Sequence, residues 1–314
     1  MNLQLLIEQY ITFRQTLGER FRTNAANLRA FGRAVGIDAA IADVRAEQVN
    51  VFLAGTGPLT HTWYVRHHAL VGFYRYATSR GHVATAPLPV VLPKRPAPFV
   101  PYLYSHEELR RLVDVAQTHQ ERRSCIEPDT VGTIVLLLYG TGLRVGEVVR
   151  LDRQDVDLGN SLLTVRQSKF YKSRLVPFSP QLQTILTRYC EQHPATICHS
   201  GRAAPFFTTR AGGRVNPQTL RVRFRRICQK AGICRDGASY QPRLHDRRHT
   251  FAVDRLTSWY RQGAWVQKLL PVLSVYLGHA HLEATAVYLS MTPDLLAEAN
   301  ARFERYAQQE VKHD

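Results

Sequence analysis

An arginine and a glutamate lie close together in a glycine-containing segment. Residues 141–147 read Thr-Gly-Leu-Arg-Val-Gly-Glu, so Arg144 comes just after a helix-ending glycine. A helix start disfavours a cation, which favours the interpretation that Arg144 is placed to bind an anion. Glu147, three residues on, could hold the guanidinium in position. The alternative is an ordinary surface ion pair.

Further groups that could act on a phosphate follow nearer the C-terminus. His245 and Arg248 are three residues apart and therefore share one face of a helix. His279 ends the sequence Tyr-Leu-Gly-His, and Tyr288 comes nine residues later. Arginine binds phosphate oxygens, imidazole donates hydrogen bonds, and a phenol can act as a nucleophile where cations or a base assist it. A single tyrosine on a helix is ordinarily a core residue.

Two lysines lie in a segment that contains no acidic residue. Between residues 158 and 180 the cations are Arg166, Lys169, Lys172 and Arg174. Lysines at a hairpin tip usually meet only solvent. Here no carboxylate compensates them, so we expect the tip to attract a phosphate backbone.

The whole chain carries an excess of positive charge. Its 314 residues include 41 Lys and Arg against 25 Asp and Glu, a formal net charge of +16 with a pI near 10.0. Segment 192–235 has nine bases and no acid. Four of these bases would form a basic helix face suited to a DNA groove: Arg221, Arg223, Arg225 and Arg226. Such charge favours a polyanionic partner, and the alternative is a basic surface without a ligand.

Prolines divide the chain into two parts. Six of the 16 prolines fall between Pro87 and Pro101. Since proline fixes φ and removes amide donors, this segment is predicted to be an extended linker. The predicted organisation is a helical domain at 1–86, a linker at 87–101 and a larger domain at 102–314. Apolar spacing predicts helices over Leu3–Leu17, Ala25–Val35 and Thr62–Arg80. On the last of these, Arg66 and Arg75 either contact phosphate or face solvent.

The second part is predicted to combine helices with one hairpin. Ser105 and Glu108 form a capping box that opens a helix, and Val131–Tyr139 is a buried helix. Leu162–Arg166 and Arg174–Phe178 are predicted to pair as antiparallel strands around the lysine turn. Further helices are expected near 181–192, 217–231, 246–260, 270–277 and 283–289. The fold class is therefore mainly α with a small antiparallel β-sheet (α+β).

Cysteine and apolar patterns argue against several other classes. The five cysteines include no CxxC pair, and a zinc site near 190–199 fits no common finger spacing. We expect neither a metal nor a cofactor. The longest apolar stretch, Thr133–Tyr139, is too short to span a membrane, and Met1–Glu8 lacks the features of a signal peptide. We therefore expect a cytoplasmic protein without a membrane partner.

The order of these motifs resembles that of the tyrosine recombinases, the phage-integrase and Xer-type enzymes. The matching stretches are Gly140–Glu147, Ser168–Pro177, Leu244–Ala252 and Leu277–His279 with Tyr288. Five motifs in the same order are a specific signal, and the resemblance covers nearly the whole chain. It implies an N-terminal helical core-binding (SAM-like) domain and a C-terminal catalytic domain.

The resemblance implies an enzyme that cuts and rejoins DNA at specific sites through a 3′-phosphotyrosine, without metal. The catalytic residues that it implies are Arg144, Lys169, His245, Arg248, His279 and the nucleophile Tyr288, with Glu147 holding Arg144. Alignment on Arg-Leu-Val-Pro places Lys169 on the general acid and leaves Lys172 as the alternative. The expected DNA contacts are Arg66, Arg75, Arg166, Lys172, Arg174, Arg221, Arg223, Arg225 and Arg226.

Double-stranded DNA and further copies of the chain are the implied partners, in a homotetramer on two synapsed sites. Other recombinases or accessory proteins are further candidate partners, and a prokaryotic mobile element acting at the nucleoid is the expected setting. Two alternatives remain open. A type IB-like topoisomerase shares the residue set but relaxes DNA as a monomer, and an inactive DNA-binding relative would have lost part of the set.

Three features call for structural comparison. Arg247 occupies a position where the family usually has leucine, and we expect it either to point outward or to compete with Arg248 for the phosphate. Trp259–Trp265 is the expected insertion. The tail after Tyr288 is predicted to form an amphipathic helix that docks on a neighbouring subunit through Leu295, Leu296, Phe303 and Tyr306.

Overall fold

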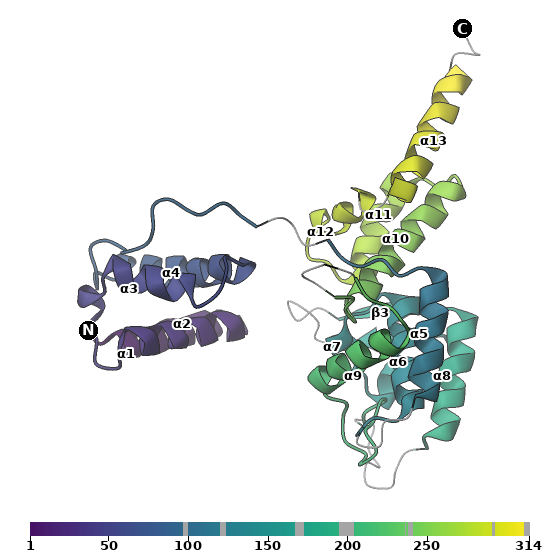
Figure 1. Ribbon diagram of the computed structural model, residues 1–314, viewed down its shortest axis with the longest axis horizontal. Helices are drawn as coiled ribbons and strands as arrows, with labels where there is room; N and C mark the ends of the chain where they lie inside the picture. The colour runs from purple at the N-terminus through teal and green to yellow at the C-terminus, as the bar shows by residue number, and fades with distance from the viewer. Residues whose placement is uncertain are drawn as a thin grey trace. The chain divides into compact units, whose positions relative to one another are not determined.

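The chain forms two compact units, Met1–Phe99 and Val100–Asp314 (Figure 1). The computed structural model describes residues 1–96, 100–119, 124–166, 173–194, 204–235, 237, 241–290 and 293–310. The boundary between the units falls within the proline-rich segment. No helix in these described ranges is long and apolar enough to cross a membrane.

The first unit is built from helices around one apolar core. Its elements are α1 (Leu3–Thr16), α2 (Arg22–Val35), the 3₁₀ helix η1 (Ile41–Asp43), α3 (Ala46–Ala54) and α4 (His61–Ser79). Asn2 caps α1 by accepting a hydrogen bond from the Leu5 amide at 3.1 Å. Apolar residues three and four apart point inward, and Phe73 and Tyr74 of α4 are fully buried. The predicted helices of this part are confirmed, and α3 is an additional one.

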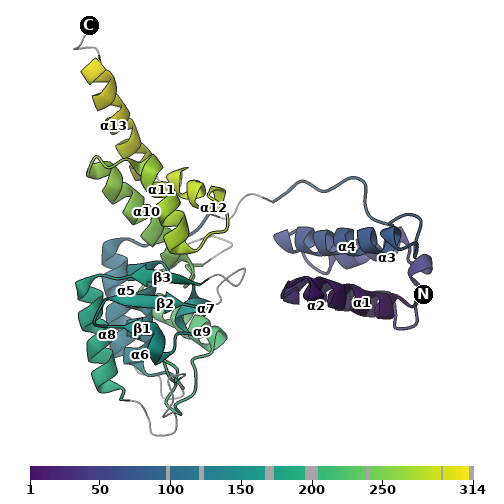
Figure 2. The ribbon, with the colours of Figure 1, turned by 180° about the vertical axis from the view of Figure 1, so that it is seen from behind.

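The second unit carries the remaining elements (Figures 1 and 2). Its helices are α5 (His106–Thr118), α6 (Pro128–Thr141), α7 (Val145–Val148), the 3₁₀ helix η2 (Arg153–Asp155), α8 (Pro180–Gln192), α9 (Pro217–Lys230), α10 (Asp246–Arg261), α11 (Val266–Leu277), α12 (Glu283–Ala286), the 3₁₀ helix η5 (Val287–Ser290) and α13 (Pro293–Glu310). Its strands are β1 (Val156–Asp157), β2 (Leu162–Val165) and β3 (Arg174–Pro177). The fold class is thus mainly helical with one small sheet.

The sheet has the order β1-β2-β3 and is antiparallel throughout (Figure 2). Leu163 pairs with Val176, and Val165 pairs with Arg174. These pairs confirm the two predicted hairpin strands, whereas β1 was not predicted because two residues are too few to show an alternating pattern. The turn with Lys169 and Lys172 lies outside the described residues.

Helix α6 lies at the centre of the second unit. It is apolar almost all round and packs against α5, α8 and α10. Ser105 and Glu108 form the predicted capping box at the start of α5, and Gly142 ends α6 in the left-handed conformation at φ 61°. A second apolar cluster joins α10 and α11 to Tyr288 and Leu295.

The C-terminal region differs from the expected helices in two places. The predicted helix over 283–289 is divided, because α12 ends at Ala286 and Tyr288 lies in the tighter η5. The expected insertion at Trp259–Trp265 forms the last turn of α10 and the connection to α11, which begins earlier than predicted. Helix α13 packs on α10 near its start and then projects away from the unit (Figure 1).

Candidate active site

Arg144 and Glu147 are held by the end of α6 and the start of α7. Arg144 is the N-cap of α7, and its Nη1 donates to Glu147 Oε1 at 3.0 Å. The Arg144 amide donates to Glu147 Oε2, also at 3.0 Å. Glu147 is only 4% exposed, so the pair is not an ordinary surface ion pair.

Arg174, at the start of β3, binds the same carboxylate. Its Nη1 and Nη2 donate to Glu147 Oε1 and Oε2 at 3.1 and 3.0 Å. Burial acts to raise the pKa of the Glu147 carboxyl, but the guanidinium groups of Arg174 and Arg144 outweigh it and hold that pKa below its ordinary value. Glu147 therefore remains an anion between two cations.

Arg248 is buried near the start of α10 and is fixed by backbone oxygens. Nη1 donates to the Gly142 carbonyl at 2.9 Å and Nη2 to the Leu277 carbonyl at 2.7 Å. Burial, reinforced by the charge of Arg144, lowers the pKa of Arg248 to about 10. The group still carries its charge at neutral pH.

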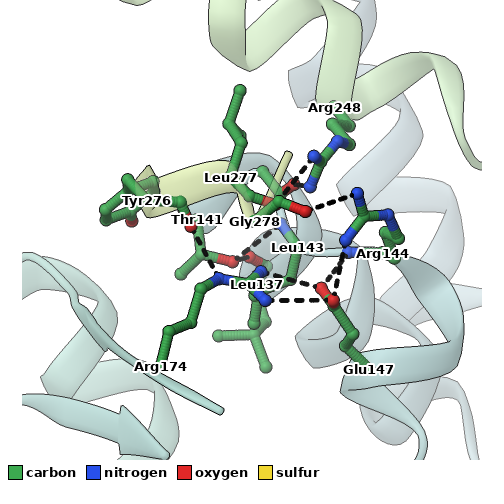
Figure 3. A network of polar contacts seen from close by, with 11 residues as sticks. Leu137, Thr141, Leu143, Arg144, Glu147, Arg174, Arg248, Tyr276, Leu277 and Gly278 are labelled. Atoms are coloured by element: carbon green, nitrogen blue, oxygen red, sulfur yellow. Dashed lines mark hydrogen bonds and ion pairs between the residues drawn. The ribbon is translucent and has the colours of Figure 1, made fainter. Parts of the chain in front are cut away.

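Arg144, Arg174 and Arg248 all donate hydrogen bonds to the C-terminal end of α11 (Figure 3). Three successive carbonyls there, which have no partner within the helix, each accept from a different guanidinium. Arg174 Nε donates to the Tyr276 carbonyl at 2.8 Å, Arg248 Nη2 to Leu277 at 2.7 Å, and Arg144 Nη2 to Gly278 at 2.9 Å. The negative end of the helix dipole also favours cations at this end.

His279 directly follows this cluster of arginines. Its Nδ1 lies 2.7 Å from the hydroxyl of Thr285, which is fully buried. Burial, with the charges of Arg248 and Arg144, lowers the pKa of His279 to about 4. The ring is therefore neutral at pH 7, and its Nδ1 is paired with Thr285.

Tyr288 lies beside His279 and is 3% exposed. Its ring centroid is 6.2 Å from that of His279, with the planes nearly parallel, and 5.5 Å from that of His249. Burial raises the pKa of the Tyr288 phenol, while Arg248 and Arg144 act in the opposite direction. The arginines thus make the phenol more acidic than burial alone would leave it.

His245 and His249 complete the group on the α10 side. Their rings meet edge to face, with centroids 5.3 Å apart. Loss of hydration lowers the pKa of His245 to about 4, with His249 and Arg248 adding to the effect, although the residue as a whole is exposed. His249 was missed by the sequence analysis. Its position directly after Arg248 was the available signal, since a residue next to His-x-x-Arg lies at the same helix start.

Several predicted DNA contacts have other partners. Arg223 is 3% exposed and donates to the His119 carbonyl, so it does not belong to the basic face of α9. Arg166 pairs with Asp155, and Arg66 donates to the Phe52 carbonyl at 2.9 Å. Among the predicted contacts that the structure describes, Arg166 is exposed despite this pairing, as are Arg75, Arg221, Arg225 and Arg226. Arg174 donates its hydrogen bonds to Glu147 and to the Tyr276 carbonyl at the end of α11.

Both expectations for Arg247 are wrong. The side chain is 0% exposed, and its guanidinium contacts residues of α9 and α6. Its guanidinium stacks on Phe224 at 4.3 Å and donates from Nη1 to the Val135 carbonyl at 3.3 Å. Within the described part of the chain, Nε and Nη2 of Arg247 have no hydrogen-bond partner, and burial lowers the pKa of Arg247 to about 10. A charge in the core costs free energy unless it is fully paired.

Replacing Arg247 with methionine is therefore expected to stabilise the protein. The Arg247→Met variant fills a similar volume without a buried charge, and the free energy of unfolding should rise by about 1–3 kcal/mol. Urea titration of the full chain measures this. The control is Arg255→Met, the same change at an exposed position of α10, which should shift stability by less than about 0.5 kcal/mol. A loss of stability in Arg247→Met would contradict the prediction.

No cluster of three or more His, Cys, Asp or Glu suited to a metal ion occurs among the described residues. The site is instead built from arginines, the Glu147 carboxylate that pairs with two of them, neutral imidazoles and the Tyr288 phenol. Such a set can bind a phosphate group and stabilise added negative charge on it. The Tyr288 phenol and the neutral imidazoles are the nucleophilic groups of this set.

Comparisons with known proteins agree with this chemistry. A sequence model of the phage integrase family matches residues 103–294. The provisionally named integrase/recombinase y4rE of Sinorhizobium fredii is 38% identical over 302 residues, which cover 94% of each protein. The tyrosine recombinase XerC of Oceanobacillus iheyensis is 29% identical over 237 residues, covering 73% of this chain and 70% of that protein.

Solved structures share the fold at lower sequence identity. A Tn1549 transposon integrase bound to transposon right-end DNA has a TM-score of 0.71 at 17% identity, with 98% of this chain and 100% of that chain covered. A lambda integrase dimer bound to a core site has a TM-score of 0.65 at 16% identity, with 93% and 97% covered.

Proposed function

The chain belongs to the phage integrase family of tyrosine-type site-specific recombinases, and we propose that it cuts and rejoins DNA with Tyr288 as the nucleophile. The observation that carries this proposal is the convergence of distant segments on one phenol. Tyr288 packs against His279 and His249, and the charges of Arg248 and Arg144 act on its hydroxyl.

The arginines are suited to hold the phosphate that Tyr288 attacks. Arg144 and Arg248 carry planar guanidinium groups fixed by Glu147 and by backbone carbonyls, so little reorganisation is needed when negative charge develops. Attack by the phenolic oxygen forms a 3′-phosphotyrosine and releases a 5′-hydroxyl. The reverse attack by a 5′-hydroxyl restores the DNA, and the ester conserves the bond energy.

Proton transfers are assigned to neighbouring groups. His245 and His279 are neutral at pH 7, so either can accept a hydrogen bond from the phenol or donate one to the phosphate. Lys169 is proposed as the general acid for the leaving 5′-oxygen, with Lys172 as the alternative. Both lysines lie outside the described residues, and their assignment rests on the sequence motif alone.

Double-stranded DNA and other copies of the chain are the proposed partners. The net charge of +16 and the exposed arginines of α9 suit a phosphate backbone. Related folds have been solved as a lambda integrase dimer on a core site and as a tetramer on a Holliday junction. On α13, Leu295 is buried, while Leu296 and Phe303 are 51% and 68% exposed, which supports docking of this helix on a neighbouring subunit.

Integration or excision of a mobile element is the proposed biological setting. It is supported by the similarity to the y4rE protein over almost the full length of both chains. A type IB-like topoisomerase is the second candidate, since it would use the same residues. Relaxation of a supercoiled plasmid that lacks the recognition site would favour the topoisomerase, and strand exchange only between paired sites would favour the recombinase.

Trapping of the covalent intermediate tests the proposal. A binding sequence is first selected from random duplexes, and nicks are then placed at successive positions so that the cleaved fragment diffuses away. We expect an SDS-resistant adduct whose DNA-linked peptide contains Tyr288. Tight binding without an adduct at any nick, or an adduct on another residue, would overturn the assignment.

A further inference from the structure

We propose that Arg174 is a positioning residue that holds both Arg144 and the His279 segment in place, and not a DNA contact. This inference rests on the proposed function. The Arg174 side chain is 9% exposed, and all three of its guanidinium nitrogens donate to groups of the protein (Figure 3). Sequence alone favoured DNA contact, because Arg174 stands in an acid-free basic segment.

The first link runs through Glu147 to Arg144. The Glu147 carboxylate accepts two hydrogen bonds from the Arg174 guanidinium and two from Arg144, one of them from its amide. Without Arg174 the buried carboxylate would be neutralised by Arg144 alone, and less of the Arg144 charge would act on a phosphate. Arg174 thus restores a net positive charge to this group of three residues.

The second link runs to the end of α11. Arg174 Nε donates to the Tyr276 carbonyl at 2.8 Å, and the guanidinium passes directly over Gly278. A Cβ on Gly278 would lie 2.6 Å from Nη1 and 2.8 Å from Cζ of Arg174, and Gly278 has a left-handed φ of 69°. The left-handed φ and this close approach together favour glycine at the residue before His279.

The position of Arg174 in the chain adds a third link. It is the first residue of β3 and follows the turn that carries Lys169 and Lys172. It therefore ties the start of β3 to the elements that carry Arg144 and His279. One side chain connects segments that are close in space but more than 100 residues apart in sequence.

Two readouts separate positioning from DNA contact. The first is the rate of adduct formation at saturating DNA, and the second is the slope of the logarithm of affinity against the logarithm of salt concentration. For Arg174→Gln we expect adduct formation to slow by about a hundredfold, the scale of a small misplacement of reacting groups. The affinity and the salt slope should stay unchanged.

The matched control is Arg166→Gln, the same change on the other side of the lysine turn, where the side chain is 55% exposed. Loss of a phosphate contact at Arg166 would make its salt slope shallower by about 0.9, and this change sets the scale for judging the slope of Arg174→Gln. A shallower slope in Arg174→Gln with normal cleavage would overturn the proposal for Arg174.

Two further variants exclude a general folding effect. Arg174→Lys keeps the charge but lacks the planar set of guanidinium donors, so it should recover only part of the rate of adduct formation. Full recovery would refute positioning. The losses of Glu147→Gln and Arg174→Gln should be non-additive in the double variant, since both act through one carboxylate. Additive losses would also refute the proposal. If the wild type forms no adduct, the proposed function fails, and the salt slope of Arg174→Gln still tests the role of Arg174.

Discussion

Replacing Tyr288 with phenylalanine is expected to abolish the covalent protein–DNA adduct while leaving DNA binding intact. The phenyl ring keeps its packing against His279 and His249, so only the attacking oxygen is lost. Removal of a nucleophile typically costs more than about a thousandfold in rate. Adduct formation on the nicked duplex measures the loss, and a gel-shift titration measures the affinity.

The matched control for this change is Tyr260→Phe. Tyr260 packs against the same apolar cluster as Tyr288 but lies on the far part of α10, near its C-terminal end. It should form the adduct at the wild-type rate. Persistence of the adduct in Tyr288→Phe would identify another nucleophile.

Replacing Arg248 with glutamine is expected to slow cleavage by at least about a hundredfold, the scale of a lost charge-stabilising donor. The glutamine amide group has too few N–H donors to hydrogen-bond the Gly142 and Leu277 carbonyls and also bind a phosphate. The substitution also removes a cation. Burial raises the pKa of Tyr288, and Arg248 is the group that does most to oppose this rise.

The direction of the pH effect follows from that cation. Without Arg248 the pKa of Tyr288 rises further, so the increase of the single-turnover rate with pH should move to higher pH. Arg248→Lys retains a charge but lacks the planar guanidinium donors, so it should slow cleavage while displacing the pH profile less than Arg248→Gln does. An unchanged pH profile in Arg248→Gln would show that Arg248 does not act on the phenol.

Local sequence was sufficient to predict most helices and the hairpin. Caps such as Ser105 with Glu108, and Asn216 before Pro217, mark helix starts because they satisfy amide groups within a few residues. The motifs that resemble those of tyrosine recombinases are likewise visible in residue types and their order. Element ends were less accurate, as the division of the last helix before Tyr288 shows.

The burial and contacts of individual arginines were harder to predict. Arg223 lies on α9 three residues after Leu220 and four before Ile227, so helical spacing already placed it on the buried face. Helical spacing therefore predicts the burial of Arg223, whereas its charge alone suggests a surface position. Arg247 is similar, since Phe251 follows it by four residues on the buried side of α10.

By itself, the sequence determined where helices begin, which residues could do chemistry and that the chain suits a polyanion, because these properties reside in neighbouring residues and total charge. Only the tertiary structure decided which cations remain available for a phosphate. A guanidinium has no preference between a phosphate, a carboxylate and a carbonyl until the fold places one of them within reach. Arg174 meets Glu147 and the end of α11, Arg247 meets the core, and Arg144 and Arg248 lie beside Tyr288.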